Sequence, residues 1–353
     1  MKHLIYIFIL ILIACNGKHR GANISVENGP ILKHEPCEST LYSFASSIDI
    51  LDSFILISSY KDTVIRLYSI DSFNPIYSYG TIGQGPFEFL QPLYTYCNGA
   101  EIGINDVNKN ELIKLKISGD SSLVSITESE RISLQSKSNI KGRFKLREMA
   151  ITRLDSSSYI TLHRGLDNDF FCLYDKNMSY LSSFGLSPVK VKSDKPLPRV
   201  CARLGGVLAT NGKGSFCYAA YGFPYLSCYT YNKGEISVNC ESFFEDTHYE
   251  IISDDLLFDK DRTKGRCLDV KMDDKYIYVL YSDALLREYS NSDIETSMSN
   301  LIIKFDYSGN VISKYSLDCY VSNFVICNKN QILYAIGYFP EQTIVKFNLE
   351  QII

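Results

Sequence analysis

The sequence lacks three features that would assign the chain to common classes of protein. Its apolar run from Leu4 to Ile13 holds ten residues, and a helix that spans a membrane needs ~20. Helical periodicity is almost absent before residue 240, which argues against a helical fold. The net charge is −4, so the chain has no excess of the basic charge that selects for nucleic acid.

The usual signatures of catalysis, redox chemistry and zinc binding are also missing. No Cys-x-x-Cys pair occurs among the eleven cysteines, which leaves zinc-ribbon and thioredoxin-type folds without support. There is no Gly-x-Ser-x-Gly elbow, no His-Glu-x-x-His and no Gly-x-x-x-x-Gly-Lys loop. The histidines His34, His163 and His248 are scattered rather than spaced as metal ligands. We therefore expect no cofactor, and a non-catalytic protein is the favoured interpretation.

What the N-terminus does contain is an export signal. A short basic start, the apolar run and the sequence Leu12-Ile-Ala-Cys15 follow one another. The last four residues resemble a bacterial lipobox, which implies cleavage before Cys15 and attachment of lipid to its thiol. The alternative is an ordinary signal peptide with a cysteine there by chance. We expect a signal peptide at 1–14, a lipidated tether at 15–30, and anchoring in the cell envelope. The outer membrane is favoured, on its periplasmic side, because no acidic cluster follows the cysteine.

The rest of the chain is rich in β-forming residues, with 26 Tyr and 19 Phe. Short strand-like runs recur in units of about 45 residues, each a hairpin followed by a return strand. The second strands of the units are expected at 54–60, 101–105, 159–163, 215–221, 275–281 and 332–338. Six such units predict an all-β, six-bladed β-propeller over residues 31–353. An open β-sandwich is the alternative.

The last unit ends after its third strand, so its fourth strand must come from elsewhere. The segment from Ile31 to Cys37 precedes the first unit and is free to supply it. Such a strand would join the first and last blades and cover two sheet edges that would otherwise promote aggregation. We predict that the last blade is closed by this N-terminal strand.

One motif carries a family resemblance. The segment Gly80-Thr-Ile-Gly-Gln-Gly-Pro-Phe-Glu-Phe-Leu-Gln-Pro92 resembles the Gly-x-x-Gly-x-Gly-Pro-Gly-Glu-Phe-x-x-Pro segment of NHL-type and TolB-like six-bladed propellers. With the lipobox, the chain resembles TolB-like propeller lipoproteins of Gram-negative anaerobes. Phe87 stands where the family usually has glycine, which puts the geometry of this turn in question. The resemblance implies a fold and an envelope location but no defined activity.

A binding site is expected where the second strand of each blade ends, because those turns gather around one mouth of the central channel. Tyrosine there offers rigid contact area and one hydroxyl, which suits a glycan fragment, a peptide or an envelope protein. The alternative is that strand ends simply favour tyrosine. The candidate ligand-binding residues are Tyr60, Asp106, His163, Arg164, Tyr221, Tyr281, Tyr338, Gln84 and Glu88.

Three other features of the sequence could have a function. For the acidic cluster and for segment 80–92, a structural interpretation is favoured. Asp254, Asp255, Asp259 and Asp261 could hold Ca²⁺, but basic residues interleave with them, so a solvated loop or short helix is favoured. The segment 80–92 has no Lys or Arg beside it and is read as a structural connection rather than a phosphate loop. Three segments, the basic 130–147 and the long 242–264 and 283–299, are candidate functional loops.

Two function classes remain open from the sequence. The favoured one is a non-catalytic binding or scaffold module, held on a membrane by its lipid and binding its ligand at the channel mouth. The alternative is a metal-dependent propeller hydrolase of the sugar-lactonase type, which would hold one divalent ion at the channel mouth. Cys217 and Cys228 are expected to face opposite sides of their sheet, since a turn at 222–224 would set Cys217 against Tyr229.

Overall fold

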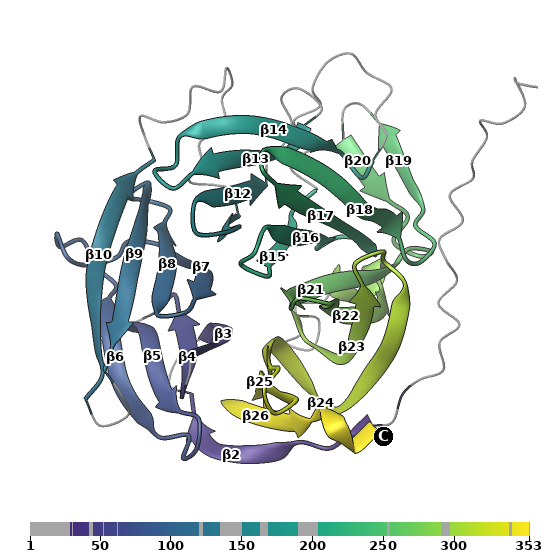
Figure 1. The fold of residues 1–353 in the computed structure, drawn as a ribbon. Coiled ribbons are helices and arrows are strands. Elements are labelled where there is room, and N and C mark those ends of the chain that lie inside the picture. Colours follow the sequence, from purple (N-terminus) through teal and green to yellow (C-terminus); the bar gives the residue numbers. More distant parts are fainter. Residues whose placement is uncertain are drawn as a thin grey trace, which may run out of the picture.

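The structure of the protein is a computed structural model. The structure describes residues 29, 31–41, 45–51, 53–61, 63–119, 123–134, 150–162, 169–189, 204–252, 255–290, 297–338 and 341–352. Within them the chain forms antiparallel sheets arranged as a ring around a central space (Figure 1). The only helices in the described part are the short 3-10 turns η2 (Leu286–Ser290) and η4 (Leu349–Ile352). The fold class predicted from the sequence is therefore confirmed.

Six four-stranded blades make up the ring, each numbered here from its innermost strand outwards. Blade 1 is β3 (Ala45–Leu51), β4 (Phe54–Ser59), β5 (Thr63–Ser69) and β6 (Pro75–Thr81). Blade 2 is β7 (Pro92–Asn98), β8 (Glu101–Asp106), β9 (Glu111–Ser118) and β10 (Ser125–Ser133). Blade 3 is β11 (Ile151–Arg153), β12 (Ser158–Leu162), β13 (Asp169–Asp175) and β14 (Tyr180–Leu186). Blade 4 is β15 (Gly206–Thr210), β16 (Ser215–Ala220), β17 (Tyr225–Asn232) and β18 (Glu235–Phe243).

The last two blades are joined into one eight-stranded sheet by a shared strand. Blade 5 is β21 (Lys264–Met272), β22 (Tyr276–Leu285), β23 (Ser299–Asp306) and the first part of β24 (Val311–Cys327). Blade 6 is the second part of β24, then β25 (Ile332–Tyr338), β26 (Gln342–Asn348) and β2 (Glu35–Thr40). The switch lies near Val321, which pairs with Ser299 of β23 on one side and with Gly337 of β25 on the other.

The N-terminal segment closes the ring, as predicted. β2 lies antiparallel to β26, with Glu35 opposite Lys346, and the two side chains form an ion pair of 2.7 Å. Ile31 and Leu32 form a separate strand on the neighbouring blade, which the sequence did not suggest. They form β1 (Ile31–Leu32), which pairs in parallel with β24 at Ser316 and Leu317, on the outer edge of blade 5. The segment therefore holds two neighbouring blades together.

The hydrophobic core is divided into six clusters, and each lies between two neighbouring blades. One cluster joins blade 1 to blade 2 through residues such as Leu56 and Ile104. Another joins blade 6 back to blade 1 through Ile336 and Ile57. The remaining four clusters cover the interfaces between blades 2 and 3, 3 and 4, 4 and 5, and 5 and 6. Six blades with six packed interfaces form a closed ring.

The second strand of each blade is buried on both faces, because neighbouring blades cover it from either side. All six residues of β4 are buried, as are all six of β16. The fourth strands are more exposed, and no residue of β6 is buried. A strand covered on both faces reads as a continuous apolar run, which explains why the second strands stand out in the sequence.

The predicted register around Cys217 is wrong. Cys217 pairs directly with Cys228, so the two thiols share one face of blade 4. The connection between β16 and β17 takes four residues instead of three, because Phe223 turns inward and is completely buried. Neither cysteine forms a disulfide, and the nine cysteines among the described residues are all free thiols.

The long segments differ in what they contain. Strands β19 (Tyr249–Ile252) and β20 (Asp255–Phe258) form a small antiparallel pair, so the expected loop or helix is wrong for Asp255, whereas Asp259 and Asp261 lie in an exposed turn as expected. Asp259 and Asp261 form ion pairs with Arg262 and Arg287. Asp254, residues 135–149 and residues 291–296 lie outside the described part of the chain. No helix in the described part is both long and apolar enough to cross a membrane.

Candidate ligand-binding channel

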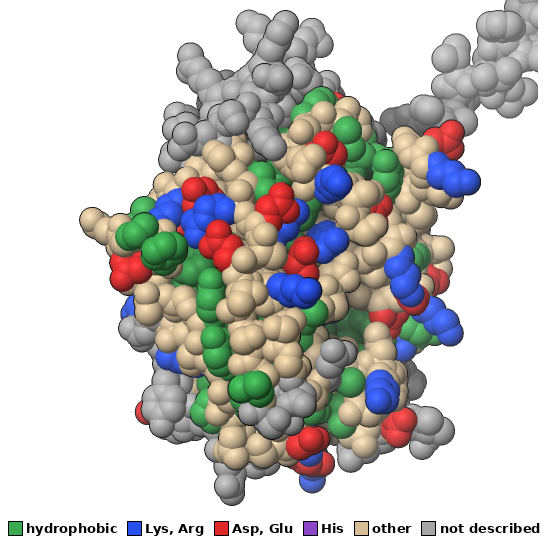
Figure 2. Space-filling model, turned by 60° about the vertical axis from the view of Figure 1, so that its left-hand side comes forward, with side chains coloured by type: hydrophobic (Ala, Val, Ile, Leu, Met, Phe, Trp, Pro, Cys, Tyr) green, Lys and Arg blue, Asp and Glu red, His purple; other side chains and the backbone are tan. Residues whose placement is uncertain are grey.

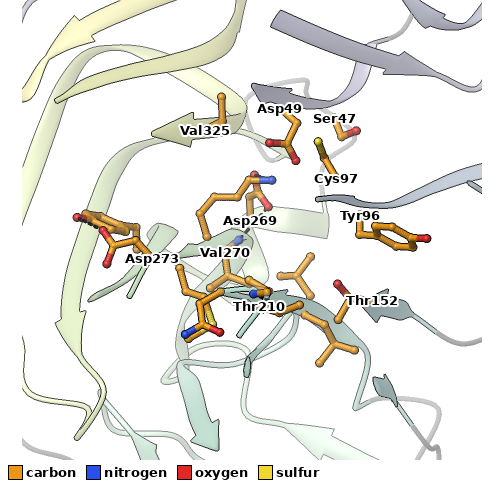
Figure 3. A pocket seen from close by; sticks show the side chains of 18 of the residues that line it. Ser47, Asp49, Tyr96, Cys97, Thr152, Thr210, Asp269, Val270, Asp273 and Val325 are labelled. Carbon is orange, nitrogen blue, oxygen red and sulfur yellow. Dashed lines mark hydrogen bonds and ion pairs between the residues drawn. The ribbon is translucent and has the colours of Figure 1, made fainter. Parts of the chain in front are cut away.

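The innermost strands of the six blades surround a cavity of about 960 Å³. They contact one another around the ring in the order β3, β7, β11, β15, β21, β24 and back to β3. Figure 3 shows side chains from several of these strands pointing into the same space, among them Asp49, Cys97, Thr152 and Asp269. We call this cavity the channel.

A charged cluster occupies the middle of the channel. The Lys271 ammonium lies 3.7 Å from the nearer carboxylate oxygen of Asp269, two residues earlier on β21. Asp269 is buried, with 5% of its surface exposed. Its carboxylate accepts hydrogen bonds from the backbone N–H groups of Val270 and Phe324. Across the channel, Asp49 on β3 accepts a 2.7 Å hydrogen bond from the Tyr94 hydroxyl on β7. Four elements from four blades therefore meet at this point.

Burial and the neighbouring charges have opposite effects on the pKa of Asp269 and on the pKa of Lys271. Burial raises the pKa of Asp269, and the nearby Lys271 lowers it in part. Burial alone would lower the pKa of Lys271, but the carboxylates of Asp269 and Asp49 outweigh it and raise that pKa above its ordinary value. Lys271 therefore stays protonated at neutral pH. Burial also raises the pKa of Tyr94, so its hydroxyl keeps the proton that it donates to Asp49.

Exposed aromatic and apolar side chains lie on the face where one mouth of the channel opens, and Tyr221 and Leu93 among them line the cavity itself. The end of each second strand lies beside the start of the innermost strand, as the pairings of Ala45 with Ser59 and of Gly206 with Ala220 show. Tyr60, Tyr221 and Tyr338 follow or end the second strands of blades 1, 4 and 6, and they are 49%, 41% and 39% exposed. We call the face on which the innermost strands begin the tyrosine face. Further large apolar side chains exposed there are Phe87, Leu90 and Leu93.

The opposite face is polar and rich in lysine. The Lys213 ammonium forms a 2.6 Å ion pair with Asp274, and both side chains are mostly exposed. Lys304 lies over the ring of Tyr276, 3.8 Å from its centre. Asp273 accepts hydrogen bonds from the backbone N–H groups of Lys275 and Tyr276. The two ends of the channel therefore differ in part: the tyrosine face adds exposed apolar side chains to charged ones such as Lys61 and Arg266, whereas the opposite end combines ion-paired side chains with the ring of Tyr276.

Comparison with known proteins assigns the fold to a family. The model of the TolB-like 6-blade propeller-like family matches residues 35–329. The chain belongs to this family. A solved structure of a putative exported protein from Bacteroides fragilis is similar over 92% of this chain and 97% of its own, at 11% identity and a TM-score of 0.51. BamB from Moraxella catarrhalis is similar over 93% of this chain and 95% of its own, at 13% identity and a TM-score of 0.40. No curated protein matches the chain.

The family motif of this TolB-like propeller connects blade 1 to blade 2 and packs against both. Gly80 has a φ of +77°, and a Cβ there would lie 2.8 Å from the ring of the buried Phe89. The Lys109 ammonium donates to the backbone carbonyls of Gly85 and Glu88. Lys109 lies between β8 and β9, so the structure places beside this segment a basic residue that the sequence analysis did not expect there, and that residue holds the segment against blade 2.

The glycine that the family usually carries at position 87 is not needed here. Phe87 has no positive φ, and its side chain is 86% exposed on the tyrosine face. The turn therefore tolerates a side chain at this position. Gln84 is exposed on the same segment, whereas Glu88 is half-buried and accepts a 2.6 Å hydrogen bond from the backbone N–H of Gly85.

Two of the candidate residues in this TolB-like propeller are buried and do not reach a ligand. Asp106 is completely buried, and its carboxylate accepts hydrogen bonds from the backbone N–H groups of Leu90, Gln91 and Lys109. It anchors the family motif instead of lining the mouth. Tyr281 is also completely buried, and its hydroxyl faces the Glu245 carboxyl inside the interface between blades 4 and 5. His163, Arg164 and Cys15 lie outside the described residues.

The sequence did not single out the channel cluster of Asp49, Tyr94, Asp269 and Lys271. A signal for part of it was present, because Asp269 and Lys271 are two residues apart in an otherwise alternating strand. Residues at that spacing point to one face of a strand. An acid and a base on the same face of an innermost strand indicate a charged channel wall.

Proposed function

We propose that this TolB-like propeller is a non-catalytic binding module whose ligand docks on the tyrosine face, over the mouth of the channel. The observation that carries this proposal is the placement of Tyr60, Tyr221 and Tyr338 at three strand ends on the face where the cavity of about 960 Å³ opens, with Tyr221 lining it. Exposed aromatic side chains beside a cavity are typical of a binding surface. The ligand class that fits is a glycan fragment or a peptide of little net charge.

The electrostatics of the protein support a ligand of this kind. Acidic and basic side chains are interspersed over the side of the molecule seen in Figure 2, so neither sign of charge dominates that view. The tyrosine face contributes rings and hydroxyls, which stack on sugar rings or peptide side chains and donate one hydrogen bond each. Neutral polar ligands gain from such a surface without needing a strong opposite charge.

The state of the channel carboxylates favours binding over the hydrolase alternative. Asp49 accepts from Tyr94, Asp269 is paired with Lys271, and Asp274 is paired with Lys213. A catalytic divalent ion needs carboxylates that can turn to it, and these are already held by donors and cations. A lactone-hydrolysis assay with added divalent metal, run on the wild type and on Asp49→Asn, separates the two functions. Metal-dependent hydrolysis, abolished by Asp49→Asn, would establish the hydrolase.

A binding experiment with matched tyrosine variants tests the proposed site. The mature protein is screened on glycan and peptide arrays, and the affinity for each hit is measured by calorimetry. Tyr221→Ala should weaken binding by about tenfold or more, as expected for a central aromatic contact. Tyr180→Ala removes a tyrosine of similar exposure, 39%, from an outermost strand and should leave affinity unchanged. Equal affinity in the wild type and both variants would place the ligand elsewhere.

We further propose that the propeller is anchored in the cell envelope by lipid on Cys15, with residues 15–30 as its tether. The lipobox-like Leu12-Ile-Ala-Cys15 supports this proposal, and two acyl chains hold a protein stably on a membrane. Cys15→Ser should move the protein to the soluble fraction and remove the acyl mass seen by mass spectrometry. Cys327→Ser, which replaces a half-buried cysteine of the propeller, should leave both unchanged. A wild-type protein without acyl chains would refute the anchor.

A further inference from the structure

Three different metal-ligating side chains meet on the outside of the ring, away from the channel. One ring nitrogen of His34, one carboxylate oxygen of Asp318 and the Cys319 sulfur all lie within 4.8 Å of one another. Among the described residues, this is the one group of three such side chains at that spacing. The Asp318 oxygen Oδ1 is 2.9 Å from His34 Nδ1 and accepts from the His34 backbone N–H at 3.0 Å. The histidine and the carboxylate are thus already held against each other.

The group sits where the N-terminal segment crosses the junction of the last two blades. β1 pairs in parallel with β24, Leu32 opposite Leu317, and continuing that register brings residue 34 alongside residue 319. Cys319 is buried, in the same core cluster as Leu32 and Phe347. The side chains of His34 and Asp318 are about one quarter exposed, at 26% and 28%. One side of the group is therefore anchored in the core, and the other opens to solvent.

We infer that His34, Asp318 and Cys319 form a binding site for one divalent transition-metal ion of the zinc type, which joins the N-terminal segment to β24. Nitrogen, carboxylate oxygen and thiolate sulfur are the ligands that Zn²⁺ takes in proteins. With metal–ligand distances of about 2.0–2.3 Å, neighbouring ligand atoms in a tetrahedral site lie roughly 3.3–3.8 Å apart. The three ligand atoms lie within 4.8 Å of one another, so a bound ion would draw them together by up to about 1.5 Å. Solvent supplies the fourth ligand.

The charge of the filled site suits its half-buried position. When Zn²⁺ binds, the Cys319 thiol releases its proton to solvent and its sulfur forms the metal bond. The thiolate and the Asp318 carboxylate then carry two negative charges, which balance the ion, while His34 binds as neutral imidazole. The bound ion would fasten the segment that closes the ring, and so it should stabilise the closed propeller.

Titration of the chelator-treated mature protein with Zn²⁺ tests this site. The wild type should bind one equivalent in competition with a chromophoric chelator, and its melting temperature should rise on binding. With Co²⁺ in place of Zn²⁺, a thiolate-to-metal absorption band should appear. Cys319→Ser should remove that band, and Cys319→Ser, Asp318→Asn and His34→Ala should each lose the bound equivalent and the shift in melting temperature.

Matched controls separate this site from metal bound elsewhere. Cys327→Ser and His248→Ala remove one cysteine and one histidine outside the group, and both should bind like the wild type. Asp318→Asn and His34→Ala change partly exposed side chains, so they keep the test open if Cys319→Ser folds poorly. Absence of a bound equivalent in the wild type overturns the proposal. It is also overturned if the three variants bind Zn²⁺ as the wild type does.

Discussion

At the scale of single residues, Lys271 is the side chain on which the channel interior depends. It is the cation beside Asp269, and the Asp49 carboxylate also contributes to its raised pKa. A carboxylate left in the channel without that cation keeps its hydrogen bonds but loses the charge that compensates its burial. Each of the two buried charges therefore needs the other, and the pair as a whole is not expected to add net stability.

Replacing Lys271 alone should therefore destabilise the protein. Lys271→Met should lower the free energy of unfolding by about 1–3 kcal/mol, since it leaves Asp269 buried without its partner. Asp269→Asn in the same chain should recover part of that loss. Lys213→Met, which breaks the exposed pair with Asp274, should cost only about 0–1 kcal/mol. Denaturant unfolding of the four proteins measures these differences, and a Lys271→Met protein as stable as Lys213→Met contradicts the account.

The same substitution has a defined pH dependence. The folded-state pKa of Lys271 is raised above its ordinary value of 10.5. Its contribution is therefore fully present below pH 10.5 and is lost as the pH rises through the raised folded value. The stability gap between the wild type and Lys271→Met should stay constant from neutral pH to about pH 10 and narrow above it.

The sequence could place a residue near the end of a strand, but it could not show whether the side chain is exposed to solvent there. This limited the prediction of the site residues. Tyr221 follows the end of β16 and is 41% exposed, whereas Tyr281 lies inside β22, which continues to Leu285, and is completely buried. Asp106 marks the same strand end in blade 2, but the backbone N–H groups of the family motif enclose its carboxylate. Which strand-end side chain reaches solvent depends on the neighbouring blade, and the local sequence does not contain that information.

At the scale of elements, the second, third and fourth strands of the blades were predictable, and the innermost strands were not. Second strands such as β4 and β16 are covered on both faces and form continuous apolar runs. An innermost strand has one face on the channel, where β3 places Ser47 and Asp49. These polar residues interrupt the apolar pattern, so the strand resembles a connecting loop in the sequence. The channel cluster was missed for the same reason.

The N-terminal strand makes an element-scale prediction about stability. A chain that starts at Ser43 lacks β1 and β2, and it loses the burial of Leu32, Cys37 and Leu41. It should be less stable than a chain that starts at Ala22 by roughly 4 kcal/mol or more, given the usual value of a buried leucine. It should also aggregate, because the edge of β26 is uncovered. Thermal unfolding without added metal compares the two, and equal melting temperatures would contradict the closing role.

At the scale of the whole molecule, six units in sequence became six blades because each interface between neighbours has its own core. The number of repeats was visible in the sequence. The need for a closing strand was visible as well, because the last unit has only three strands of its own and its outer edge needs a fourth. What the sequence did not contain was the position of β1 on the neighbouring blade, or the sharing of β24 between two blades. Both arise from contacts between residues far apart in the chain.

The ring also explains how aromatic side chains from distant parts of the chain come to lie on one face. All innermost strands begin on the same face, so the second-strand ends and the family motif meet there even though they are far apart in the sequence. Tyr60, Phe87, Tyr221 and Tyr338 come from three blades and one connection. The exposed apolar side chains of Phe87, Leu90 and Leu93 distinguish this mouth from the opposite one, where Lys213 and Asp274 form an ion pair.

Hydrogen exchange of the mature protein, free and bound to a ligand from the screen, tests the central claim most directly. Exchange reports local opening of the backbone, and a docked ligand slows it where the two touch. The account predicts slowed exchange at the starts of β3, β7 and β15 and in the segment 80–92, all on the tyrosine face. Slowed exchange confined to the outermost strands β6, β10, β14 and β18 would contradict it, because the ligand would then bind the rim of the ring.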